Sequence, residues 1–108
     1  ATRPQQSHFP VHQQVVAGAG DLVVELAALA AGGKMTEAQR AIVESLAAPR
    51  AAIVLGGLAM RHSRFAELRA AAAALAKKTG ATLGFLPDGG NAAGAALAGA
   101  LPHRLPGG

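Results

Sequence analysis

The sequence has no cysteine, no tryptophan and no tyrosine among its 108 residues. Without cysteine the chain holds no disulfide, no thiolate metal site and no cysteine-bound iron–sulfur cluster. Its longest uncharged stretch, around residues 89–101, is shorter than the ~18 apolar residues that a membrane-spanning helix requires. We therefore expect neither a disulfide scaffold nor direct membrane insertion.

Small residues dominate the composition. Alanine occurs 28 times and glycine 14 times, whereas leucine, valine, isoleucine and phenylalanine together number 25. A chain of this length suits one domain with a modest core. Because the sequence begins with Ala1 rather than methionine, we expect a processed chain or a piece excised from a longer protein.

Basic residues outnumber acidic ones by ten to six, which gives a net charge of +4. They are spread along the chain, and only residues 61–69 form a modest cluster. Nucleic-acid-binding proteins usually combine a basic stripe with stacking aromatic side chains. The one aromatic residue in the cluster, Phe65, is expected in the core. We therefore predict no nucleic-acid partner.

The first third of the chain predicts an arm, a strand and a helix. Residues 1–10 are polar and contain two prolines, which indicates an arm. Residues 11–17 predict a strand that ends at a glycine-containing turn. Asp21 is the expected cap of a helix that runs to about residue 31, where Gly32 and Gly33 end it. The apolar face of this helix comprises Leu22, Leu26 and Leu29.

A second helix and a strand follow. Thr36 and Gln39 match a capping box, in which the threonine oxygen accepts a backbone N–H and the glutamine side chain reaches back. Residues 51–55 are an unbroken apolar run, which suits a strand covered on both faces in a parallel sheet. The helix that begins after Thr36 is expected to end before Pro49. The apolar face of this helix comprises Ile42, Val43 and Leu46.

The longest helix is expected between two strands. Ser63 is its predicted cap and Gly80 its end, with Lys77 and Lys78 where the helix dipole favours cations. Residues 81–86 predict the second strand, residues 87–90 a turn, and Asn91 the cap of a last helix to about residue 100. The predicted buried face of the long helix comprises Phe65, Leu68, Ala72, Leu75 and Ala76.

These elements predict an α/β fold: a short, mostly parallel sheet with flanking helices in a Rossmann-like three-layer arrangement. From residue 51 onward the order strand, helix, strand, helix indicates a βαβ crossover, which is right-handed when its strands are parallel. We expect residues 11–108 to form one domain or subdomain. Residues 11–48 supply a strand and two helices, and residues 51–101 supply a βαβα unit.

Two glycine motifs fall short of nucleotide-binding patterns. Residues 18–23 begin like a dinucleotide fingerprint, but Val23 replaces the third glycine and no strand with an acidic residue follows about 20 residues later. Gly33-Lys34 resembles the end of a P-loop, but Met35 stands where serine or threonine must reach magnesium. A simple strand–turn–helix is favoured at the first motif, and the second is a coincidence.

The polar residues predict no catalytic residue and no metal ligand. His8 and His12 have a spacing that joins two ligands on a helix, but Pro10 between them disfavours that helix. Asp21 and Asp88 are the only aspartates, and both are expected at caps or turns, so no Ser/His/Asp set is suggested. The glutamates fall on exposed helix positions, so no carboxylate pair is available for acid–base catalysis.

Residues 89–102 are the most informative stretch. Glycines precede Asn91, and the small residues after it leave a smooth helix face. The stretch suits a tightly packed helix or a helix N-terminus aimed at an anionic ligand. With the strand, helix and strand before it, this stretch resembles the molybdopterin-oxidoreductase family. The positions that carry the likeness are Asn91, Gly94-Ala95, residues 99–102 (Gly-Ala-Leu-Pro) and Pro106-Gly107.

Within that family the likeness is greatest to the large iron–sulfur subunits of bacterial NADH:quinone oxidoreductases, or respiratory complex I. Residues 84–87 (Gly-Phe-Leu-Pro) and 90–95 carry it. The resemblance implies a non-catalytic α/β portion that scaffolds the peripheral arm at the cytoplasmic face of the bacterial inner membrane. It implies that no cofactor binds here and that the iron–sulfur clusters lie elsewhere in the parent chain. Gly90, Asn91 and Gly94 would be a vestigial cofactor loop.

The implied partners are other subunits or the remainder of the parent chain. The thin core also predicts an exposed apolar edge through which the chain can self-associate. Leu97 stands where cofactor-bearing members of the family often have an acidic residue, which sets this chain apart from them. Two alternatives stay open: a pterin-dinucleotide- or nucleotide-binding piece of a molybdopterin enzyme, and a stand-alone α/β module for a nucleotide or small anion.

Overall fold

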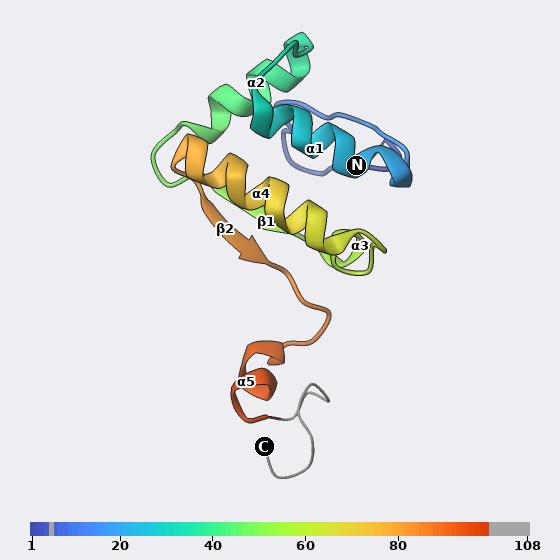
Figure 1. Ribbon diagram of the computed structural model, residues 1–108, viewed down its shortest axis with the longest axis vertical. Helices are drawn as coiled ribbons and strands as arrows, with labels where there is room; N and C mark the ends of the chain where they lie inside the picture. Colours follow the sequence, from blue (N-terminus) through green and yellow to red (C-terminus); the bar gives the residue numbers. More distant parts are fainter. Residues whose placement is uncertain (5, 100–108) are drawn as a thin grey trace.

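The computed structural model describes residues 1–4 and 6–99, and Figure 1 shows the order of the elements. Its helices alternate with two short strands in the second half of the chain. In order, the elements are the 3₁₀ turn η1 (Ala19–Asp21), α1 (Leu22–Ala31), α2 (Glu37–Leu46), β1 (Ala52–Leu55), α3 (Gly57–Met60), α4 (Phe65–Thr79), β2 (Thr82–Phe85) and α5 (Ala92–Leu97).

The two strands pair in parallel, with Ala52 opposite Thr82 and Leu55 opposite Phe85. The pairing continues for one residue beyond β2, because the backbone N–H of Leu86 donates to the Leu55 carbonyl at 2.9 Å. The chain between the strands contains α3 and α4, so this is the expected βαβ connection. The predicted α/β class, with a short parallel sheet and flanking helices, is confirmed.

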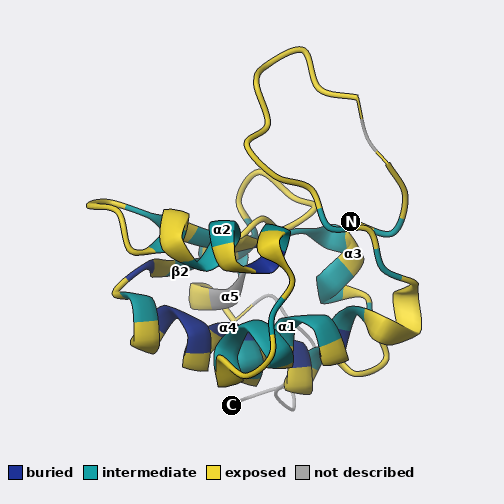
Figure 2. Ribbon diagram, turned by 90° about the horizontal axis from the view of Figure 1, so that it is seen from above, coloured by how far each residue is buried: buried dark blue, intermediate teal, exposed yellow. Residues whose placement is uncertain are grey.

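The core lies under α4, which covers one face of the sheet and packs beside α1 (Figures 1 and 2). Its alanine-rich sequence has high helix propensity and contains no internal glycine or proline. Four of the five residues predicted for its buried face are buried, and Phe65 is half-buried. Gly80 ends the helix in the left-handed conformation, at φ +79°, as the sequence predicts. The buried four are Leu68, Ala72, Leu75 and Ala76.

The predicted end of α1 and the predicted cap and end of α2 are also confirmed. Gly32 ends α1 at φ +73°. The capping box of α2 is formed, since the backbone N–H of Gln39 donates to Thr36 Oγ1 at 3.2 Å and that of Thr36 donates to Gln39 Oε1 at 2.8 Å. The helix ends at Leu46, before Pro49.

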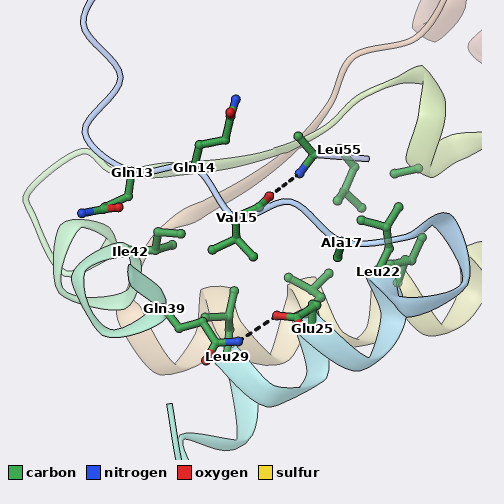
Figure 3. Close-up of a pocket in the computed structure, with 14 residues that line it drawn as sticks. Gln13, Gln14, Val15, Ala17, Leu22, Glu25, Leu29, Gln39, Ile42 and Leu55 are labelled. Atoms are coloured by element: carbon green, nitrogen blue, oxygen red, sulfur yellow. Dashed lines mark hydrogen bonds between the residues drawn. The ribbon is translucent and has the colours of Figure 1, made fainter. Parts of the chain in front are cut away.

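The strand predicted over residues 11–17 is wrong. This segment contains no assigned strand, and it runs above α1 towards η1 (Figure 3). Its backbone bonds to the first residue instead: the N–H of Ala17 donates to the Ala1 carbonyl at 2.9 Å, and the Ala1 amino group donates to the Val15 carbonyl at 2.8 Å. A valine-rich run becomes a strand only where a partner strand takes up its backbone groups.

The two other predicted helix caps have different outcomes. Asp21 is the residue that precedes α1, as predicted, but it also belongs to η1 and makes no side-chain capping bond. The predicted Ser63 cap is wrong, because the residue before α4 is Arg64, which makes no side-chain capping bond either. The short helix α3 was not predicted, and the turn that follows it displaces the start of α4. The Arg64 backbone N–H donates to His62 Nδ1 at 3.0 Å, so a histidine supports this turn.

Residues 1–4 and 6–99 cover only one face of the sheet, so within this part of the chain the expectation of a strand covered on both faces is wrong for β1. Side chains alternate along each strand, and the uncovered side leaves Val54 58% and Leu86 64% exposed. Helix α5 stands apart from the body (Figure 1), so it does not supply the missing layer. We call this side the open sheet face, which comprises Ala52, Val54, Thr82, Gly84 and Leu86.

Candidate functional site

The three residues of the predicted cofactor loop lie together at the start of α5. Gly90 and Asn91 precede the helix and Gly94 lies in its first turn. The Asn91 carbonyl accepts from the backbone N–H of Ala95 at 2.9 Å. Its side-chain amide lies over Gly94, where a β-carbon would collide with it. The side-chain amide of Asn91 therefore lies against the first turn of α5, while Asn91 itself stays exposed. The motif positions at 100–102 and 106–107 lie outside the described residues.

A carboxylate lies at the end of the sheet where open α/β folds bind anions. Asp88 follows β2, and its Oδ2 accepts from Arg61 Nη2 at 2.5 Å. Its Oδ1 lies 3.0 Å from the position that a β-carbon on Gly57 would take, at the first residue of α3. The negatively charged side chain of Asp88 therefore lies at the carboxyl end of the sheet, between the segments that follow β1 and β2. The sequence places Asp88 in a turn but gives no sign of its partner, which is 27 residues away.

The basic cluster of residues 61–69 is partly neutralised within the chain. Besides the Arg61–Asp88 pair, Arg64 donates to Glu67 from Nε at 2.7 Å and from Nη2 at 2.5 Å. Hydrogen bonding from Arg64 is the largest cause that lowers the pKa of Glu67 below its ordinary value, and the pKa of Arg64 is raised in turn. Exposed ion pairs of this kind contribute little to stability. They reduce the positive charge that the cluster presents to solvent.

The described histidines, His8, His12 and His62, lie in separate parts of the structure. His62 accepts at Nδ1 from Arg64, and its Nε2 lies 2.8 Å from the Ala19 carbonyl. Its ring therefore joins the α3–α4 turn to η1. His8 and His12 lie in the arm and its continuation, outside any helix. Across residues 1–4 and 6–99, no three residues of the metal-binding types gather into a site.

In the part of the chain that the structure describes, no helix has both the length and the apolar character to cross a membrane.

The predicted leucine face of α1 lines a cavity of about 370 Å³ (Figure 3). It lies between α1, α2 and β1, beneath residues 13–17. Glu25 and Gln39 form a polar wall on the helix side, with Gln39 Nε2 donating to Glu25 Oε2 at 2.7 Å. Ala1, Gln13 and Gln14 add polar groups on the opposite side. This site was not predicted from the sequence. The expectation that Glu25 occupies an exposed helix position is wrong, because the residue is half-buried and lines the cavity.

No protein-family model, curated protein or solved structure matches the chain. The functional assignment therefore depends on the residues and on their arrangement.

Proposed function

We propose that this chain is a non-catalytic α/β portion of the large iron–sulfur subunit of a respiratory NADH:quinone oxidoreductase, where it scaffolds the peripheral arm. The observation that carries the scaffolding role is the open sheet face, with Val54 58% and Leu86 64% exposed. Parallel sheets are normally covered on both faces. A covering partner is therefore expected, either the remainder of a parent chain or a neighbouring subunit.

The end of the described chain supports the same role. Leu97 on α5 is 90% exposed, and the other described elements make no extensive contact with this helix (Figure 1). A six-residue helix is too short to be stable alone in water. A second packing surface supplied by a partner would account for a helix at this place.

The family assignment comes from the resemblance around Asn91 and from the order β1, α4, β2, α5. Scaffolding is favoured over anion binding for two reasons. The Asp88 carboxylate lies at the carboxyl end of the sheet, where it would repel an anion, and the Asn91 amide lies against the first turn of α5. In such a complex this portion would lie at the cytoplasmic face of the bacterial inner membrane. The iron–sulfur clusters would be bound by cysteines elsewhere in the parent chain.

Photo-crosslinking tests the assignment in the cell. A benzophenone side chain is placed at position 54 in the chromosomal gene, and the matched control is position 24, since Val24 on α1 is 61% exposed. We expect adducts from position 54 to migrate with NADH-oxidising activity in native gels, and few adducts from position 24. Adducts confined to other proteins, or a surrounding coding sequence without cysteines at iron–sulfur spacing, would overturn the assignment.

Sedimentation of the isolated chain tests the open sheet face itself. Without its partner, the chain is expected to self-associate through this face as its concentration rises. Val54→Lys should abolish the association, whereas Val24→Lys, at an equally exposed valine, should leave it unchanged. A chain that stays monomeric at all concentrations, or two variants that behave alike, would contradict the role given to this face.

A further inference from the structure

The cavity between α1, α2 and β1 is large enough for a small molecule. Its volume is about 370 Å³, and pockets that bind small ligands begin at about 300 Å³. The composition explains why it is not filled: alanine is abundant and large apolar residues are few. Three helices and a strand supply its aliphatic wall, which comprises Leu22, Leu26, Leu29, Ile42, Leu55 and Leu68.

One charged side chain belongs to this wall. Among the described residues that line the cavity, Glu25 alone has a charged side chain, and the other charged group is the Ala1 ammonium, which donates to the Val15 carbonyl at 2.8 Å. Figure 3 shows it beside Gln39, on the opposite side of the cavity from Val15. The carboxylate therefore faces a largely aliphatic space, where a hydrogen bond to a charged group is stronger than in water.

Gln39 holds this carboxylate in place. Its Oε1 accepts from the Thr36 backbone N–H at 2.8 Å, and its Nε2 donates to Glu25 Oε2 at 2.7 Å. The glutamine is only 8% exposed, so both ends of its amide are fixed by the start of α2 and by α1. A carboxylate offers about four acceptor positions. The bond from Gln39 leaves Glu25 able to accept from a ligand.

We propose that this cavity binds a small alkyl- or arylalkylammonium ion. The ammonium group donates to the Glu25 carboxylate, and the hydrocarbon part packs among the leucines. An apolar cavity of about 150 Å³ holds benzene, so this one has room for an aromatic ring with a short amine chain. An anion bound in the same pose is disfavoured because its charge would lie beside Glu25, whereas the Ala1 ammonium lies beside Val15 and already donates to the Val15 carbonyl. This inference does not depend on the proposed scaffolding role.

Titration of the ¹⁵N-labelled chain with 2-phenylethylamine tests the proposal, with ethylbenzene and 3-phenylpropionate as the neutral and anionic counterparts. We expect amide shifts along α1 and near Ile42. The amine should bind at least tenfold more tightly than ethylbenzene, and the carboxylate should not bind. No shift with the amine at millimolar concentration, in a chain whose spectrum shows it folded, would overturn the proposal.

Two variants separate the charge from the hydrocarbon part. Glu25→Gln keeps an acceptor for Gln39 but removes the charge, so affinity for the amine should fall at least tenfold while affinity for ethylbenzene stays the same. Glu44→Gln, at an exposed position on α2, should change neither. Leu29→Phe fills part of the cavity and should lower the affinity for both the amine and ethylbenzene. Equal affinity of wild type and Glu25→Gln for the amine, or undiminished binding by Leu29→Phe, would refute the site.

Discussion

Gln39 on α2 donates a 2.7 Å hydrogen bond from Nε2 to Oε2 of Glu25 on α1. The same side chain completes the capping box of α2 through Oε1. One buried amide therefore both begins a helix and joins it to its neighbour. The local role could be read from four consecutive positions, whereas the second role depends on where α1 lies.

The first prediction concerns this amide. Gln39→Glu keeps the oxygen that accepts from Thr36 but replaces the donor with a second carboxylate facing Glu25. We expect the free energy of unfolding at pH 7 to fall by about 1–3 kcal/mol, because a hydrogen bond becomes a charge repulsion. Urea denaturation measures it, with Gln6→Glu in the exposed arm as the same change at a solvated position. Equal stability of the two variants would show that the Gln39–Glu25 bond does not join the helices.

The second prediction concerns the core under α4. Leu75 is 1% exposed, and Leu75→Ala should lower the free energy of unfolding by about 2–5 kcal/mol, since buried leucines lose contacts and leave a cavity. Leu97→Ala removes the same atoms from a side chain that is 90% exposed, and its effect should stay within about 0.5 kcal/mol. Thermal unfolding followed by circular dichroism compares them. Similar melting temperatures for both variants would contradict the packing described for α4.

The third prediction concerns the end of α4. Gly80 has φ +79°, and a β-carbon there would meet no atom within 4 Å. Gly80→Ala should therefore destabilise through backbone strain alone, by about 1–2 kcal/mol. Gly33→Ala is the control, because its added β-carbon is also unobstructed and its φ is not positive. Chemical denaturation should show a lower midpoint for the first variant only, and Gly80→Asn should cost less than Gly80→Ala.

The fourth prediction concerns acid stability. Hydrogen bonds from Arg64 lower the pKa of Glu67 from its ordinary value of 4.5. The unfolded chain therefore takes up this proton at a higher pH than the folded chain. The stability from the pair is present above pH 4.5 and is lost as the pH falls through the lowered folded-state pKa. Glu67→Gln should show a shallower loss of stability in this range than wild type, and Glu44→Gln should not. If the curves of unfolding free energy against pH are parallel for wild type, Glu67→Gln and Glu44→Gln, the Arg64–Glu67 pair does not form in solution.

Features that depend on a few neighbouring residues could be predicted from the sequence. The capping box of Thr36 and Gln39, the left-handed glycines at 32 and 80, and the two strands all formed where expected. The Ser63 cap failed because the preceding turn, supported by His62, starts α4 later. The strand over residues 11–17 failed because its backbone bonds to Ala1 instead.

The candidate sites divide in the same way. Gly90, Asn91 and Gly94 lie together because they are close in sequence. Arg61 and Asp88 meet only because parallel pairing brings the ends of β1 and β2 to the same edge. Glu25 lies beside Gln39 only because α2 folds back near α1. No spacing rule links either pair, so their partners could not be found by inspection of the chain.

The order of residues alone was enough for the α/β class, for the succession of helices and strands in the second half apart from α3, and for the places where α1, α2 and α4 end. These features depend on apolar periodicity and on the conformational freedom of glycine, both of which act over a few residues. Which face of the sheet is covered, where the cavity lies and which carboxylates meet a partner emerged only in three dimensions. Those outcomes depend on contacts between distant segments, and the scarcity of large side chains leaves both a cavity and an open sheet face.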